Sequence, residues 1–194
     1  DTAPSAPSIE LAPVHQGQDL LVAFNHEASA NASYRYTWSK DGASQPNLDS
    51  ERVPSERLTR GELWRVDVRA VRAGQRSEPS TAETTIVNAP PEASLAFTQA
   101  AYDTREDLSV LATVTDLEGD ETTVAWTWLV DGEPADAEGP TLLASQTAKG
   151  QRWTAKVTPS DPFDSGVTTE LETVIGNTSP TMSGVRIEPA APVP

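Results

Sequence analysis

The chain has 194 residues, no Cys and a formal net charge of −15 at pH 7. This charge argues against nucleic acid and anionic lipid as partners, and the lack of Cys excludes disulfides and thiolate metal sites. No apolar run approaches the roughly 20 residues of a membrane-spanning helix, so we expect no membrane insertion.

In chain order, the first half consists of short apolar runs between turns, after a Pro-rich start at 1–7. The clearest run is 64–70, where Trp64, Val66 and Val68 alternate with charged residues, as in a half-buried antiparallel strand. A second run, at 34–40, ends in Trp38 and a tight Asp-Gly turn. The expected strands are 8–12, 20–24, 34–40, 64–70 and 83–87, with short middle strands within 43–58.

The second half repeats this pattern, and no segment has a helical period over more than a turn. In 124–130 the alternation predicts Val124, Trp126, Trp128 and Val130 on the inward face. The expected strands are 94–97, 108–115, 124–130, 141–144, 153–158 and 169–175. The sequence therefore predicts an all-β fold.

The two halves are copies of one module. Trp38 and Asp41 recur as Trp128 and Asp131, and Trp64 recurs as Trp153. A period of about 90 residues is close to the ~100 of an immunoglobulin-like sandwich. We predict one domain over 1–89 and a second over 90–178.

The link between the copies, 88–91, reads Asn-Ala-Pro-Pro. Two prolines make it short and stiff, and the sequence predicts a rod-like pair of domains. Residues 179–194 are expected to be the start of a truncated third repeat or a tail, because 185–189 echoes 9–13.

The Trp…Asp-Gly and Gly-x-x-Trp positions resemble the tandem immunoglobulin-like and PKD-like repeats of secreted bacterial surface proteins. Gly150 to Trp153 carries the second of these motifs. The resemblance implies two tandem immunoglobulin-like antiparallel β-sandwiches joined by a short Pro-rich linker, and an extracellular or cell-surface location. Such repeats often carry a disulfide, and here Val22 with Val66, and Val110 with Ala155, stand at its positions.

The tryptophans have two interpretations: they form a hydrophobic core, or they are exposed and stack on sugar rings. They alternate in phase with Val and Ala, which favours the core. The predicted core residues are Trp38, Trp64, Trp128 and Trp153.

Two acidic loops of the second copy are the strongest functional signal. Asp116, Glu118 and Asp120 follow one predicted strand, and Asp161 and Asp164 follow another. In an immunoglobulin-like sandwich these loops share one end, so their carboxylates are expected to converge. Carboxylate oxygens suit Ca²⁺, and the five residues are the predicted metal ligands.

The first copy could add a ligand to this site from Asp19 or Glu62, but its own loop at 72–76 has no acidic residue. The alternative is a solvated acidic loop that binds nothing tightly.

The sequence contains few residues that could support catalysis. There is no Cys, and the two histidines, His15 and His26, lie outside any nucleophile or metal motif. We expect a non-enzymatic spacer or adhesion segment of a larger extracellular protein, stiffened by Ca²⁺, with neighbouring repeats of the same chain as partners. The alternatives are a module that binds a protein or glycan, and accessory domains of an extracellular hydrolase.

Overall fold

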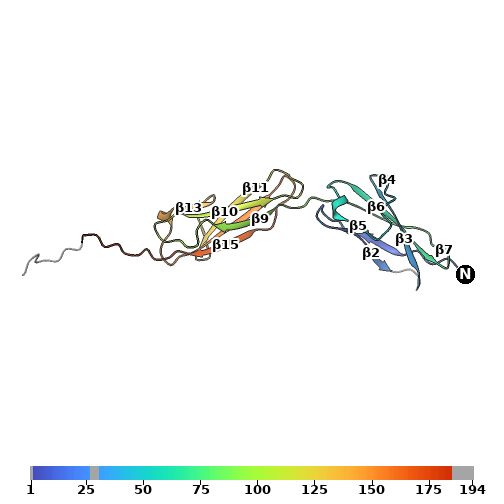
Figure 1. Ribbon diagram of the computed structural model, residues 1–194, viewed down its shortest axis with the longest axis horizontal. Helices are drawn as coiled ribbons and strands as arrows, with labels where there is room; N and C mark the ends of the chain where they lie inside the picture. The colour runs from blue at the N-terminus through green and yellow to red at the C-terminus, as the bar shows by residue number, and fades with distance from the viewer. Residues whose placement is uncertain (1, 27–30, 185–194) are drawn as a thin grey trace, which may run out of the picture. The chain divides into compact units, whose positions relative to one another are not determined.

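The computed structural model describes residues 2–26 and 31–184. Within these ranges the chain forms β-strands and two 3₁₀ turns, η1 (Ser55–Arg57) and η2 (Ala144–Gln146). This confirms the predicted all-β fold of antiparallel sheets (Figure 1). Neither turn is long or apolar enough to cross a membrane, and the described residues contain no other helix.

The first repeat is a sandwich of two sheets. One sheet has the order β1-β2-β5, and in the other β6 lies between β3 and β8, with β4 beyond β3 and β7 also pairing with β6. This places three early strands opposite a sheet built around β6, as in an immunoglobulin-like domain. The strands are β1 (Ser8–Leu11), β2 (Leu20–His26), β3 (Ser33–Lys40), β4 (Ala43–Ser44), β5 (Arg52–Val53), β6 (Leu63–Arg72), β7 (Gln75–Arg76) and β8 (Ser80–Thr85).

The second repeat has the same plan, which agrees with the sequence period. Its sheets have the orders β9-β10-β13 and β12-β11-β14-β15. The strands are β9 (Glu92–Phe97), β10 (Leu108–Thr115), β11 (Thr123–Val130), β12 (Glu133–Ala135), β13 (Thr141–Leu142), β14 (Arg152–Ser160) and β15 (Thr169–Val174).

Several local predictions differ from the structure, and the physical reason is clear for three of them. The strand expected at 83–87 is β8, which begins at Ser80 because its pairing with β6 runs from Thr85 opposite Leu63 to Ser80 opposite Val68. The strand expected at 141–144 ends at Leu142, because η2 begins at residue 144. Val124 was predicted to face inward but is 40% exposed, because the core of the second repeat reaches Trp126 and not Val124.

Each core is centred on a pair of tryptophans. Trp38 and Trp64 meet edge to face with ring centroids 6.2 Å apart, and Trp128 and Trp153 meet in the same way at 6.3 Å. All four side chains lie in the core, with at most 4% of their surface exposed. The indole N–H groups of Trp38 and Trp128 donate to the backbone carbonyls of Ser50 and Gly139. The copies therefore share packing as well as topology.

Apolar side chains fill the positions at which the sequence resemblance implies a disulfide. Val22, Val66, Val110 and Ala155 are all buried, with at most 7% of their surface exposed. Packing between the sheets replaces a covalent bridge there.

The repeated Asp-Gly turn closes the hairpin after β3 and after β11. Asp41 and Gly42 both have positive φ, as do Asp131 and Gly132, which is the backbone of a two-residue turn of this type. Each aspartate also accepts a hydrogen bond from the backbone N–H of the first residue of a later strand, Asp41 from Leu63 and Asp131 from Arg152. The aspartate thus ties the turn to the neighbouring strand.

The chain divides into two compact units whose limits differ from those of the sequence repeats. The first unit contains residues 1–92 together with the loop segments 114–123 and 159–167. The acidic loops therefore belong to the same unit as the first repeat. The domain boundaries at 89/90 and 178/179 stay predictions. Residues 179–184 contain no strand, and the rest of the expected third repeat, 185–194, lies outside the described residues.

Truncation of a core tryptophan tests the packing. We expect Trp128→Ala to destabilise the second repeat by about 3–5 kcal/mol, because the indole is buried and its loss leaves a cavity. Leu111→Ala is the control, since Leu111 is 61% exposed and its loss should cost less than about 0.5 kcal/mol. Urea denaturation followed by circular dichroism measures both, and equal losses would contradict the predicted role of Trp128.

Candidate cation site

Three aspartates converge where two strands of the second repeat end. Asp116 directly follows β10, Asp120 lies four residues later, and Asp161 directly follows β14. One carboxylate oxygen from each lies within 4.8 Å of the others, and all three residues are partly buried. The cluster lies wholly within the first compact unit.

The leading aspartate of each loop folds that loop. Asp116 accepts a hydrogen bond from the backbone N–H of Asp120 at 2.8 Å. Asp161 accepts from the N–H groups of Phe163 and Asp164, both at 2.6 Å. Aspartate side chains commonly accept backbone hydrogen bonds of this kind in turns. Gly119 supplies the positive φ that the first loop requires. The same side chains that shape the loops therefore bring the carboxylates together.

Two carboxylate oxygens at this site are buried without a hydrogen-bond partner. They are Oδ2 of Asp116 and Oε2 of Glu118. The other oxygen of Glu118 accepts from the backbone N–H of Ala89 at 3.3 Å. A buried, unpaired charged oxygen is costly, typically by 1–3 kcal/mol or more. These two oxygens are consistent with a site that takes a cation.

Arg60 provides a positive charge to the cluster. Its guanidinium forms a bidentate ion pair with Asp120, one contact of which is at 3.2 Å. The same group lies over the ring of Phe163, 4.2 Å from the centroid. The hydrogen bond with Asp120 is the main cause that raises the pKa of Arg60, and the charges of Glu118 and Asp116 add to it. Arg60 therefore remains charged.

Asn88 links Arg60 to the second loop. Its side-chain oxygen accepts from Arg60, and its amide donates to Asp161 at 2.8 Å and to Asp164 at 3.0 Å. Desolvation is the largest single influence on Asp161 and raises its pKa. The hydrogen bonds from Asn88, Asp164 and Phe163, together with the charge of Arg60, outweigh it and hold the pKa of Asp161 below its ordinary value. Asp161 is thus ionised at neutral pH.

The five predicted ligands do not all meet. Asp116, Asp120 and Asp161 form the cluster, whereas Glu118 and Asp164 are not part of the group of three and bond to Ala89 and Asn88. Asp19 and Glu62, suggested as further ligands, bond instead to Arg52 and Lys40.

The residues that the sequence analysis missed are Arg60, Asn88 and Phe163. One signal could have pointed to the first two. They recur in the second copy as Lys149 and Asn177, at the same offset of 89 as the tryptophans Trp64 and Trp153.

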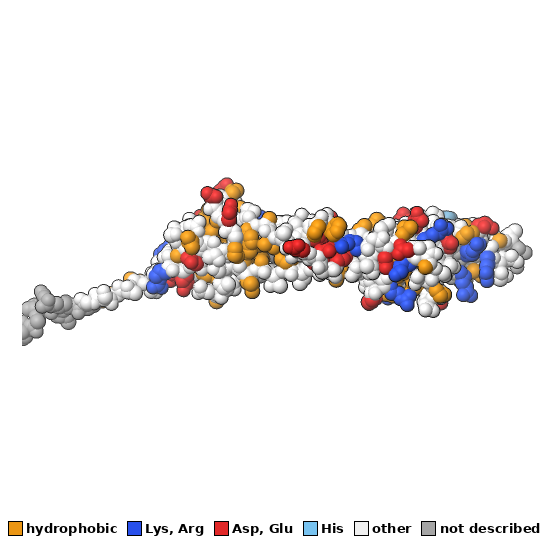
Figure 2. Space-filling view, turned by 90° about the horizontal axis from the view of Figure 1, so that it is seen from above, with side chains coloured by type: hydrophobic (Ala, Val, Ile, Leu, Met, Phe, Trp, Pro, Cys, Tyr) orange, Lys and Arg blue, Asp and Glu red, His pale blue; other side chains and the backbone are white. Residues whose placement is uncertain are grey.

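The charge of the site remains strongly negative. Five carboxylates against one guanidinium leave a formal charge of −4 (−5 + 1). This agrees with the uneven charge of the two copies, since residues 1–89 carry 9 Lys/Arg and 12 Asp/Glu but residues 90–177 carry 4 and 16. Figure 2 shows the basic side chains gathered mainly on the first repeat. The arrangement can bind a cation through oxygen ligands.

Comparisons with solved structures found matches of low sequence identity. A two-domain fibronectin type III segment of chicken tenascin is 14% identical in sequence and has a TM-score of 0.42. The match covers 87% of this chain and 98% of the tenascin segment. The mouse nectin-like molecule 4 ectodomain is 15% identical and has a TM-score of 0.38, and the match covers 93% of this chain and 67% of the ectodomain. Murine CEACAM1b is 12% identical, with coverages of 89% and 100% and a TM-score of 0.33. No protein-family model matches the chain, and no curated protein matches it in sequence.

Removal of the Asn88 amide tests the electrostatics of the cluster. We expect Asn88→Ala to raise the pKa of Asp161, because the carboxylate loses its side-chain hydrogen bond. The folded-state pKa of Asp161 lies below its unfolded value, so its stabilising contribution is present above the unfolded pKa and is lost as the pH falls through the folded pKa. NMR titration of the side-chain carboxyl carbons measures the change.

Asp103 is the internal control for this titration. Its pKa is lowered mainly by a side-chain hydrogen bond from Arg105, which Asn88→Ala leaves in place. An unchanged Asp161 titration in the variant would show that Asn88 does not stabilise that carboxylate.

Proposed function

We propose that the chain is a non-enzymatic structural or adhesion segment of a larger extracellular or cell-surface protein, in which Ca²⁺ stiffens the acidic loops. The observation that carries the cation is the group of Asp116, Asp120 and Asp161, with a buried, unpartnered oxygen on Asp116. The scaffold of two immunoglobulin-like sandwiches is compatible with a structural or adhesion module.

The surroundings of the histidines support a role without catalysis. His15 accepts a hydrogen bond from the backbone N–H of Gly17 at 3.3 Å, which is a turn contact. Neither His15 nor His26 forms a hydrogen bond to a serine hydroxyl or a carboxylate of another residue that the structure describes. A nucleophile activated by a histidine needs such a contact.

The donor set favours Ca²⁺ over other common cations. All side-chain donors at the cluster are oxygens, whereas Zn²⁺ is bound most often by Cys and His. Ca²⁺ accepts 6–8 oxygens at 2.3–2.6 Å in an adaptable geometry, while Mg²⁺ requires a near-ideal octahedron. Three aspartates from two loops, completed by backbone carbonyls and water, suit the more adaptable ion.

Arg60 and a divalent cation would share Asp120. The guanidinium already neutralises one of the carboxylates, so a bound ion has either to use the remaining oxygens or to displace Arg60. The competing interpretation is that Arg60 alone serves as the counter-charge and the loops bind no ion. The two interpretations differ in what Ca²⁺ does to stability.

The alternatives are a module that binds a protein or glycan, and accessory domains of an extracellular hydrolase. The first has one supporting observation at the acidic loops. Leu117 and Phe163 are 54% and 60% exposed beside the cluster, which gives the loops apolar surface for contact with another molecule. Pull-down or glycan-array binding that is lost in Phe163→Ser would favour this function over a purely structural one.

Thermal unfolding in excess EDTA and in millimolar Ca²⁺ tests the cation site. At about 100 times its dissociation constant, Ca²⁺ stabilises the folded state by about 2.7 kcal/mol, which raises the transition temperature by several degrees. We expect this shift in the native protein and its loss in the double variant Asp116→Asn, Asp161→Asn. The matched control is Asp136→Asn, Glu138→Gln, which removes two exposed negative charges from a turn of the same repeat. Superimposable melts of the native protein would overturn the calcium proposal.

A second variant distinguishes a shared site from a structural ion pair. We expect Arg60→Gln to raise the affinity for Ca²⁺, because it removes the positive charge that competes for Asp120. Isothermal titration calorimetry with CaCl₂ measures the affinity. Arg65→Gln is the control, since Arg65 pairs with Asp67 outside the cluster. A weaker affinity in Arg60→Gln would show that Arg60 organises the site and does not compete with the ion.

A further inference from the structure

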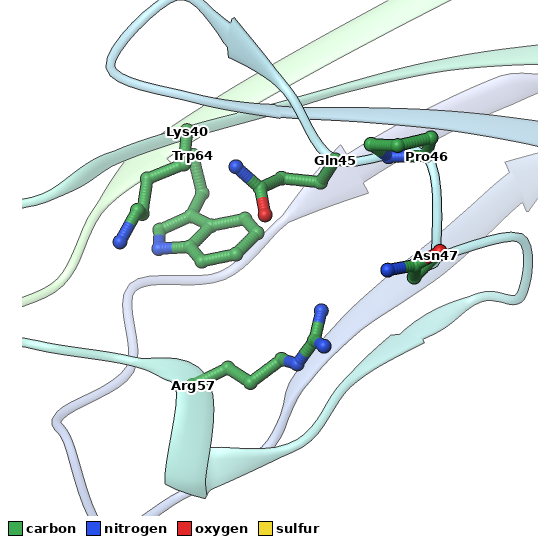
Figure 3. A pocket seen from close by; sticks show the side chains of 6 residues that line it. All are labelled: Lys40, Gln45, Pro46, Asn47, Arg57 and Trp64. Atoms are coloured by element: carbon green, nitrogen blue, oxygen red, sulfur yellow. The ribbon is translucent and has the colours of Figure 1, made fainter.

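A second polar site lies in the first repeat, away from the acidic loops in sequence. It is a pocket of about 310 Å³ lined by Lys40, Gln45, Pro46, Asn47, Arg57 and Trp64 (Figure 3). The lining comes from the end of β3, the segment after β4, η1 and the start of β6. All of these residues belong to the first compact unit.

The lining is positive and rich in hydrogen-bond donors, although the chain carries a net charge of −15. It contains two cations and two carboxamides, and no carboxylate. Glu62, beside the pocket, bonds to Lys40 Nζ at 2.9 Å and to the indole N–H of Trp64 at 3.0 Å. With Glu62 included, the formal charge of Lys40, Arg57 and Glu62 is +1 (2 − 1).

Arg57 is the cation available to a ligand. It is exposed, and its guanidinium has no hydrogen bond or ion pair to any of the described residues. Figure 3 shows its side chain extending from η1 into the pocket, across from Trp64 and Gln45. A planar guanidinium in this position offers two parallel N–H donors, the geometry that binds a carboxylate.

The second repeat shows that the fold does not require this lining. At the positions of Lys40 and Gln45 it has Val130 and Ala135, and both pack against the core. At the position of Arg57 it has Gln146, whose side-chain oxygen accepts from the backbone N–H of Leu143 at 2.8 Å. The tryptophan is retained as Trp153. The polar groups of the first repeat are therefore a feature of that copy and not of the sandwich.

We propose that this pocket binds a carboxylate-bearing sugar, such as one uronic acid unit. Arg57 would hold the carboxylate, Lys40 would add a second positive charge, and the amides of Gln45 and Asn47 would bond to ring hydroxyls. A volume of about 310 Å³ is at the lower end of ligand pockets and suits a single sugar ring. The indole of Trp64 is 1% exposed and forms the floor. This binding is independent of the proposed calcium site.

The test is a titration of the ¹⁵N-labelled protein with sodium glucuronate, followed by NMR at constant ionic strength in EDTA. EDTA removes any contribution of bound Ca²⁺, so failure here is distinct from failure of the cation site. We expect saturable shifts of the backbone amides of Gln45, Asn47 and Arg57, and none with glucose, which lacks the carboxylate. Arg57→Gln, the residue found in the second repeat, should weaken binding about tenfold or more. Arg76→Gln, an exposed cation on β7, should leave it unchanged.

Three outcomes would overturn the proposal. Absence of saturable shifts with glucuronate would exclude the site, and equal binding by glucose would exclude a role for the carboxylate. An unaltered affinity in Arg57→Gln, with an unaltered melt, would show that the ligand binds elsewhere. N-acetylglycine supplies one carboxylate without the ring, and tighter binding by it would show that the sugar assignment is wrong.

Discussion

The edge-to-face contact between two buried tryptophans is the constraint on which each sandwich depends. No disulfide joins the sheets, so packing around Trp38 and Trp64, and around Trp128 and Trp153, must hold them together. A buried indole N–H also needs an acceptor. Trp64 donates to Glu62, and Trp153 donates to Gln151. The same structural demand is met by a charged group in one copy and a neutral one in the other.

This difference in the acceptor affects the neighbouring chemistry. Glu62 is charged and therefore recruits Lys40 to the edge of the pocket. Burial of Glu62 acts to raise its pKa, but hydrogen bonds from Lys40, Trp64 and Thr59 outweigh the burial and keep the pKa below its ordinary value. Gln151 attracts no such cation, and Val130 packs on the core in place of the lysine. The residue that accepts the hydrogen bond of the buried indole thus affects whether a cation lies at the edge of the pocket.

The sequence predicted what depends on periodicity. Alternation along β6 and β11 placed the tryptophans, and the β-sandwich plan predicted that the loops containing Asp116 and Asp161 would meet. The prediction that Val124 faces the core was wrong, because alternation shows which face of a strand a residue lies on but not where the core ends. The sequence also missed Arg60, because a single arginine in a turn has no pattern, and its partner Asp120 lies 60 residues away. Comparison of the copies, Arg60 with Lys149 and Asn88 with Asn177, carried the missing information.

One short segment supplies charged groups to both candidate sites. From the end of η1 to the start of β6, Arg57 extends into the pocket, Arg60 pairs with Asp120, and Glu62 bonds to Lys40. The counterparts in the second copy are Gln146, Lys149 and Gln151, so only one of the three positions keeps its charge. Arg57, Arg60 and Glu62 are not core residues, whereas Leu58 between them belongs to the core. These charged side chains can therefore differ between the copies without loss of the sandwich. The tryptophan packing is shared by both copies, while the three charged groups occur together in the first copy alone. The one position that is charged in both copies is that of Arg60, which contacts an acidic loop, and the positions of Arg57 and Glu62 are charged only in the first copy.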